Sequence, residues 1–161
     1  MNRQFLEPET HIITYGQDAT TMETGFIPVF RLQVQQNLVE ALVRTDKGLE
    51  ALDEALALVE RTGERLHESE FYRLKGQLLL ARSIDNHSAA EACFHHALTI
   101  ARRQQAKSLE LRAALSLARL WQRQGKCDEA RELLAPIYGW FTEGFDTANL
   151  QEATTLLNEL A

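Results

Sequence analysis

The sequence predicts an all-α protein built from antiparallel helix hairpins, about three of them followed by a C-terminal capping helix. Three observations lead to this prediction: a short pattern that returns about every 40 residues, amphipathic segments on both sides of each polar turn, and stop residues at the expected helix ends. The returning pattern places Ala51, Ala90 and Ala130 early in a second helix, 39 and 40 residues apart. Antiparallel helices joined by a short turn approach closely near that turn, so a small side chain is favoured there.

Hydrophobic periodicity and stop residues place the individual helices. Pro28 suits a first helical turn, Gly63 and Gly125 suit left-handed stops after a helix, and Ser88 with Glu91 predicts a capping box. The predicted helices cover residues 28–45, 48–62, 66–83, 88–105, 107–124, 127–138 and 147–160.

Length and charge favour a single domain that does not bind nucleic acid. The protein has 161 residues and a formal net charge of −6, and nucleic-acid affinity depends on a basic surface that meets phosphates. We assign residues 26–161 to a helical repeat domain and residues 1–25 to an N-terminal tail or degenerate half repeat. No segment reaches the roughly 18 apolar residues of a membrane helix, and the N-terminus lacks the order of a signal peptide, so a cytoplasmic location without membrane contact is expected.

The last repeat unit carries the most specific pattern. Ala118 lies twelve residues before Ala130, and Trp121 follows it by three. With the other residues that match, this unit resembles a tetratricopeptide repeat, a family of helix hairpins that stack into a right-handed superhelix. Matching classes occur at Leu117, Gly125, Leu134, Ile137 and Pro136 in this unit, at Tyr72, Gly76, Leu79, Ala90, Phe94 and Ala97 in the middle unit, and at Leu38, Leu42, Ala51, Ala55 and Leu58 in the first.

The sequence from about residue 26 onward also resembles the C-terminal repeats of large bacterial regulators. The resemblance is carried by residues 72–80, 106–114 and 134–147. In those relatives a signalling ATPase module, and sometimes a class III nucleotide cyclase, lies upstream and performs the catalysis. This sequence has neither a GxxxxGK[ST] phosphate loop nor a pair of metal-binding aspartates on a hairpin. The resemblance therefore implies a protein that is not an enzyme and has no cofactor.

No metal or redox site is expected from the histidines and cysteines. His95, His96 and Cys93 are neighbours in the sequence, but successive helical residues point about 100° apart and do not converge on one ion. Cys93 and Cys127 have no CxxC spacing, which favours two reduced, packed thiols.

One polar surface is a candidate binding site. In a stack of helix hairpins the first helices of successive units line the concave face, so their polar side chains should gather in one groove. Guanidinium groups bind carboxylates in a bidentate manner, and such a groove would take an acidic segment or the C-terminus of a partner protein. The alternative is a solvated charged face without a ligand. The residues concerned are Arg73, Gln77, Arg112, Ser116, Arg119 and Arg123.

A second candidate is the aromatic segment that follows the last hairpin. Its four rings are Tyr138, Trp140, Phe141 and Phe145, and each buries about 150–250 Å² when packed. We expect them to fold back beneath the closing helix as a cap of the repeat stack. The alternative is that they contact a partner or form a dimer interface.

Three function classes follow from these patterns. The first is a non-catalytic protein-interaction module, regulatory or scaffolding, that binds a peptide or helix of a protein partner in the concave groove. The second is a structural piece that self-associates as a homodimer, and the third is a small-ligand sensor. Detection of a stoichiometric partner favours the first class, and a monomer at high concentration excludes the second.

Overall fold

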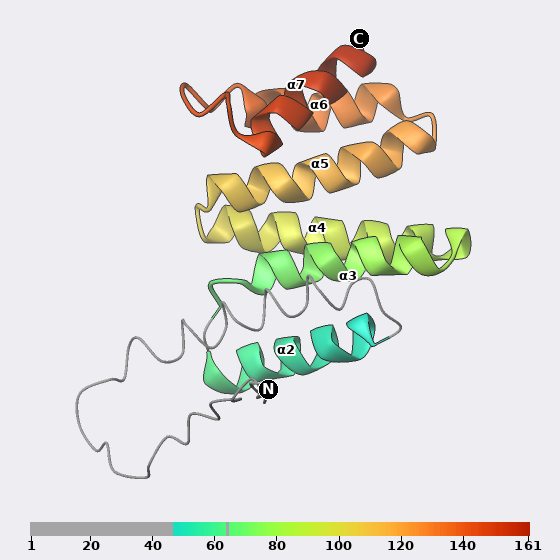
Figure 1. Ribbon diagram of the computed structural model, residues 1–161, viewed down its shortest axis with the longest axis vertical. Helices are drawn as coiled ribbons and strands as arrows, with labels where there is room; N and C mark the ends of the chain where they lie inside the picture. Colours follow the sequence, from blue (N-terminus) through green and yellow to red (C-terminus); the bar gives the residue numbers. More distant parts are fainter. Residues whose placement is uncertain (1–46, 64) are drawn as a thin grey trace, which may run out of the picture.

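A computed structural model describes residues 47–63 and 65–161 (Figure 1). The predicted tail over residues 1–25 and the predicted helix over 28–45 lie outside these ranges. The described residues form six α-helices and one 3-10 turn, η1, over Ile84–Asn86. The helices are α2 (Gly48–Thr62), α3 (Glu68–Arg82), α4 (His87–Arg103), α5 (Lys107–Arg123), α6 (Cys127–Tyr138) and α7 (Ala148–Glu159).

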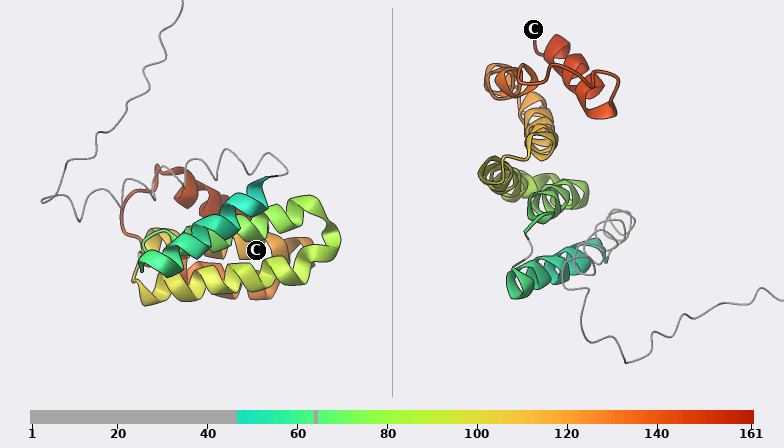
Figure 2. Two further views of the ribbon diagram at one scale, coloured as in Figure 1. Left: turned by 90° about the horizontal axis from the view of Figure 1, so that it is seen from below. Right: turned by 90° about the vertical axis from the view of Figure 1, so that its left-hand side faces the viewer.

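The six helices pack in sequence order, each antiparallel to the one before it (Figures 1 and 2). The predicted all-α class and the antiparallel pairing are therefore confirmed. The connections α2–α3, α4–α5 and α6–α7 lie at one edge of the stack, on the left in Figure 1, and the connections α3–α4 and α5–α6 lie at the other. Alternate helices also touch, since α3 contacts α5 and α5 contacts α7.

The predicted helix boundaries lie within two residues of the observed ones, and the two glycine stops are confirmed. Gly63 and Gly125 have φ angles of 73° and 78°, a left-handed conformation that costs glycine little.

The predicted capping box is wrong. Helix α4 begins one residue before Ser88, after the η1 turn, with Asn86 as its N-cap residue and no side-chain capping bond. The carboxylate of Glu91 instead accepts a hydrogen bond of 2.7 Å from Nε1 of Trp121 on α5.

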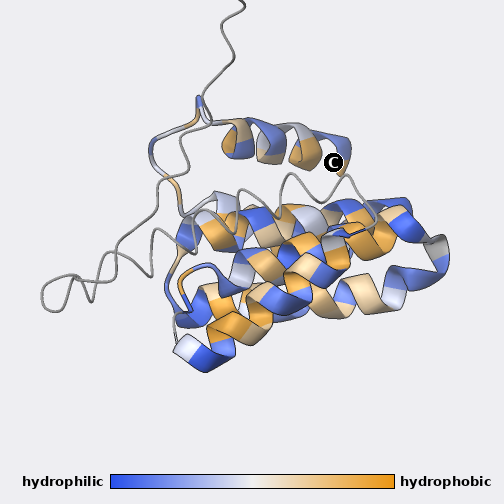
Figure 3. Cartoon of the chain, turned by 60° about the horizontal axis from the view of Figure 1, so that its bottom comes forward, coloured by the Kyte–Doolittle hydropathy of each residue, from blue (hydrophilic) through white to orange (hydrophobic). Residues whose placement is uncertain are grey.

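The hydrophobic core has two parts, and each helix turns its apolar face toward its neighbours (Figure 3). A smaller cluster joins α2 to α3 through residues such as Leu52 and Phe71, and a larger one joins α4 to α7. Ala90 and Ala130 are completely buried, as expected for small residues at close helix approaches. Packing of amphipathic faces, more than helix propensity, stabilises helices of this length.

Helices α3 and α4 approach each other closely at Gly76. A methyl group built on Gly76 would lie 2.5 Å from Cε1 of Phe94, whose side chain is fully buried. Carbon atoms that are not bonded to each other prefer a separation of about 3.5–4.0 Å. Because glycine has no side chain, the Phe94 ring can pack directly against the backbone of α3 at position 76.

A buried carboxylate fixes the turn between α4 and α5. Glu110 is only 4% exposed, and its carboxylate accepts hydrogen bonds from Nε of Arg102 at 2.9 Å and Nζ of Lys107 at 2.8 Å. Burial alone would raise the pKa of Glu110, but the hydrogen bonds from Lys107 and Arg102 outweigh it and hold the pKa below the ordinary value of 4.5. The ionised form is thus favoured by folding.

We predict that this carboxylate makes stability depend on pH in acid. A carboxyl group whose pKa is lowered on folding contributes stability above its unfolded pKa, and the contribution is lost as the pH falls through the folded pKa. Glu110→Gln should lower the free energy of unfolding by about 1–3 kcal/mol at neutral pH and flatten its decline below about pH 4.5. Urea titrations at a series of pH values test this. An unchanged decline in the variant would contradict it.

Candidate functional site

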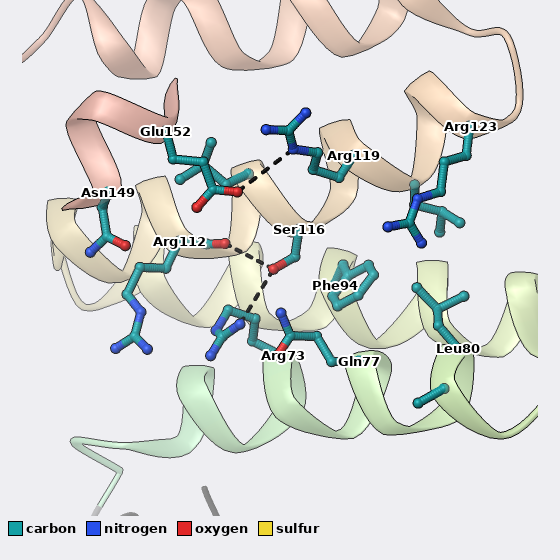
Figure 4. Close-up of a pocket in the computed structure, with 13 residues that line it drawn as sticks. Arg73, Gln77, Leu80, Phe94, Arg112, Ser116, Arg119, Arg123, Asn149 and Glu152 are labelled. Carbon is teal, nitrogen blue, oxygen red and sulfur yellow. Dashed lines mark hydrogen bonds and ion pairs between the residues drawn. The ribbon is translucent and has the colours of Figure 1, made fainter. Parts of the chain in front are cut away.

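The candidate site is a pocket of about 440 Å³ bounded by α3, α5 and α7, which we call the α3–α5–α7 groove (Figure 4). All six polar residues predicted from the sequence line it, so the structure brings them together. Helices α3 and α5 supply them because these helices touch directly across the stack. The lining residues are Arg73, Gln77, Leu80, Ala81, Phe94, Arg112, Leu115, Ser116, Arg119, Leu120, Arg123, Asn149 and Glu152.

One end of the groove is held by a buried carboxylate. Glu70 is 1% exposed and accepts hydrogen bonds from Nε and Nη2 of Arg73, the first at 2.9 Å. Nη2 of Arg112 lies 2.7 Å from the same carboxylate, so Glu70 links α3 to α5. Arg73 is itself buried, with 8% of its surface exposed. Both guanidinium groups therefore have a carboxylate partner in Glu70, and Arg73, which is buried, is chiefly a structural residue.

Ser116 completes this network. Its hydroxyl donates to the backbone carbonyl of Arg112 at 3.1 Å and lies 3.5 Å from Nη1 of Arg73 (Figure 4). The hydroxyl thus bridges the two helices at mid-groove. A hydroxyl that already has both a donor and an acceptor partner has little remaining capacity for a ligand.

Arg119 pairs with the closing helix. Its Nη1 lies 2.6 Å from Oε2 of Glu159, and its Nε lies 3.6 Å from Oε1 of Glu152. Gln122 donates a further hydrogen bond to Glu159 at 3.0 Å. The bonds from Gln122 and Arg119 hold the pKa of Glu159 below its ordinary value. These exposed pairs tie α7 to α5, and pairs of this kind contribute little to stability because water screens them.

The other end of the groove has unfilled donors. Arg123 and Gln77 are exposed, and neither makes a hydrogen bond or ion pair with any residue in the part of the protein that the structure describes. In Figure 4 the Phe94 ring lies between these two side chains, with Gln77 next to Arg73 and Leu80 below Arg123. This end combines a free guanidinium, a free amide and an apolar wall, the composition of a site for a carboxylate attached to an apolar group.

The four rings of the aromatic segment divide into two pairs. Tyr138 and Phe141 are half-buried against the main core, and the Tyr138 hydroxyl accepts a hydrogen bond of 2.9 Å from Thr154 on α7. Trp140 is 58% exposed and Phe145 is 46% exposed. Each exposed ring contacts a half-buried one: Phe145 lies 5.9 Å from Tyr138, and Trp140 lies 5.1 Å from Phe141, between ring centroids.

Sequence reasoning missed three contributors to the groove. They are the buried counter-ion Glu70, the apolar wall at Phe94, and the α7 residues Asn149 and Glu152. The spacing of Glu70 and Arg73, three residues apart on one helix, is a signal for an ion pair that was available in the sequence. No comparable signal placed α7 against the groove.

The histidines and cysteines do not gather into a metal site in the described part of the protein. Within residues 47–63 and 65–161, no group of three or more His, Cys, Asp and Glu side chains could hold a metal ion. Over the same ranges, no helix has both the length and the apolar character needed to cross a membrane. Cys93 and Cys127 are free thiols, and burial raises the pKa of the Cys93 thiol. His95 lies against Trp121 and His96 against Tyr72, so the two imidazoles face different partners.

Comparison with known proteins gives no family for this protein. No protein-family model matches it, and neither does any of the curated proteins or solved structures compared with it.

Proposed function

We propose that this protein is a non-catalytic protein-interaction module of the tetratricopeptide kind, regulatory or scaffolding, whose groove binds a peptide or helix of a partner protein. Three features support a right-handed repeat stack: the 39- and 40-residue spacing of Ala51, Ala90 and Ala130, the antiparallel pairs, and the contacts between alternate helices α3, α5 and α7. In such a stack the alternate helices form one continuous surface, and the groove lies on it.

The free donors at the Arg123 end carry the proposal. The other three groove arginines already have carboxylate partners, whereas Arg123 has none among the described residues. A ligand carboxylate gains most where it meets a guanidinium that has no competing partner. We infer that the partner presents one carboxylate, from an acidic side chain or from its own C-terminus, beside an apolar side chain that packs near Leu80.

Replacing Arg123 should test this site directly. An array of peptides that end in an apolar residue followed by Asp or Glu supplies the probe, and the best binder is then measured by fluorescence anisotropy. Arg123→Ala should weaken its affinity about tenfold or more, because a hydrogen bond to a charged group contributes roughly 1.5–3 kcal/mol. Because Arg123 is exposed, the variant should fold normally.

The matched control is Arg131→Ala, which removes an exposed arginine on α6 that does not line the groove. Its affinity should stay within about twofold of wild type, since surface charges far from a site mainly change the association rate. Equal losses in both variants would show that only net charge matters. No binding by any peptide of the array would argue against the proposed site. Arg73→Ala is unsuitable as a test because this residue is buried and its loss would perturb folding.

A further inference from the structure

A second surface lies at the edge where α2–α3, α4–α5 and α6–α7 connect, away from the groove. Four cations gather there with an exposed tryptophan. Contacts link them into one strip: Glu68 pairs with Arg65 and Arg103, the Gln104 side chain donates to the Arg65 carbonyl, and Glu110 pairs with Arg102 and Lys107. We call this strip the turn-edge surface. Its members are Arg65, Arg102, Arg103, Lys107 and Trp140.

The charges of this surface are arranged by depth. The side chains of Arg65, Arg102 and Arg103 are 49%, 54% and 62% exposed, and that of Lys107 is 36% exposed. Their counter-ions face inward, since the side chains of Glu68 and Glu110 are only 8% and 6% exposed. Four cations against two carboxylates leave a positive excess among these six described side chains. This stands out in a protein with a net charge of −6.

Trp140 is held in place although it is exposed. The edge of the Phe141 ring supports it, with centroids 5.1 Å apart, and Nζ of Lys107 lies 5.7 Å from the ring centre. Trp140 lines a hollow in the surface together with Arg102, Gln105 and Lys107. A pre-positioned tryptophan beside arginine and lysine is the composition of an interface hot spot, since it offers apolar area at little entropic cost.

The backbone at this hollow is also strained. Gln105 has a φ angle of 55°, and it is the one non-glycine residue with a positive φ in the part of the protein that the structure describes. A left-handed conformation costs a residue with a Cβ atom roughly 1–2 kcal/mol. The same conformation follows α5 at Gly125, so at Gln105 it ends helix α4, and it places this residue at the rim of the hollow beside Trp140.

We propose that the turn-edge surface docks an acidic protein segment, with carboxylates on the arginines and Lys107 and one apolar side chain on Trp140. Charge complementarity selects the occupant, because the four exposed cations outnumber their two buried carboxylate partners. A protein segment fits better than nucleic acid, since a net excess of two charges neutralises few phosphates and the rest of the molecule repels a polyanion. Glu143 and Asp146 belong to the same loop as Trp140 but do not line the hollow.

The test uses peptides with acetylated and amidated ends and is carried out in the Arg123→Ala variant, in which the proposed groove site is disabled and cannot bind the glutamates. Their sequence is a run of glutamates around one central position, which is Trp, Leu or Gly. The Trp and Leu peptides should bind and the Gly peptide should bind at least several-fold more weakly, with affinity falling as salt is raised. In a ¹H–¹⁵N spectrum the indole signal of Trp140 should shift on binding, and that of Trp121 should not.

Trp140→Ala should weaken binding of the Leu peptide about tenfold. The matched control is Phe145→Ala, which removes the other exposed ring of the same loop and should leave affinity within about twofold. Because these measurements are made in the Arg123→Ala variant, failure of this proposal and failure of the groove proposal are separable. The proposal is overturned if the peptides do not bind or if Trp140→Ala leaves their affinity unchanged. It is also overturned if a single-stranded oligonucleotide or an anionic vesicle binds more tightly than the peptides. Loss of a dimer of the protein in Trp140→Ala would overturn it as well.

Discussion

Glu70→Ala should lower the free energy of unfolding by about 3–5 kcal/mol. The carboxylate is 1% exposed and lies within hydrogen-bonding distance of both Arg73 and Arg112. Its removal leaves the buried guanidinium of Arg73 without a counter-ion, and breaking one partner of a buried pair costs more than the pair itself contributes. Urea denaturation followed by far-UV circular dichroism measures the change.

An exposed ion pair provides the control for Glu70. Glu152→Ala removes a carboxylate that lies 3.6 Å from Arg119 with 47% of its side chain exposed, and it should cost no more than about 1 kcal/mol. Both carboxylates pair with groove arginines, so the comparison isolates burial. Similar small losses in the two variants would contradict a structural role for Glu70 and return Arg73 and Arg112 to the set of possible ligand contacts.

Gly76→Ala should destabilise the protein by about 1–3 kcal/mol, although alanine normally favours a helix over glycine by roughly 1 kcal/mol. The added methyl group would lie 2.5 Å from the Phe94 ring, and that ring is fully buried and cannot swing away. The α3–α4 packing must therefore open. A lower midpoint of urea denaturation, with an unchanged slope, is the expected observation.

A double variant identifies the source of this cost. Phe94→Leu shortens the side chain beneath position 76, so Gly76→Ala combined with Phe94→Leu should be more stable than the sum of the single changes predicts, by about 1 kcal/mol. Strict additivity would mean that the Gly76 effect does not arise from the ring. A stabilising Gly76→Ala would show that the two helices have room to separate.

The helical framework was predictable because its signals are local. Helix propensity, amphipathic periodicity and left-handed glycines act within a few residues, and they placed every described helix boundary within two residues. The predicted capping box was wrong because a distant contact overrides the local pattern. Ser88 and Glu91 satisfy the local pattern, but Glu91 has a stronger partner in Trp121, thirty residues away in the sequence.

The burial of polar side chains on helix α3 could not be predicted from the sequence pattern. Glu68, Ser69, Glu70 and Arg73 are all polar, yet all four are buried. They are buried because α3 is enclosed by α2, α4 and α5. Helices α4 and α5 supply hydrogen-bonding and charged partners for them. For example, the Ser69 hydroxyl donates to the carbonyl of Ala97 at 2.9 Å. Periodicity reports one buried face and does not describe a helix covered on several sides.

The all-α class, the helix boundaries and the group of polar residues that share one groove could all be predicted from the amino-acid sequence. Which of those residues are available to a ligand became clear only once the helices were placed against one another. Three of the four groove arginines have carboxylate partners, Arg123 has none among the described residues, and the four rings divide into half-buried and exposed pairs. The physical reason is that availability depends on burial and on counter-ions brought from distant helices, and both exist only after the helices have packed.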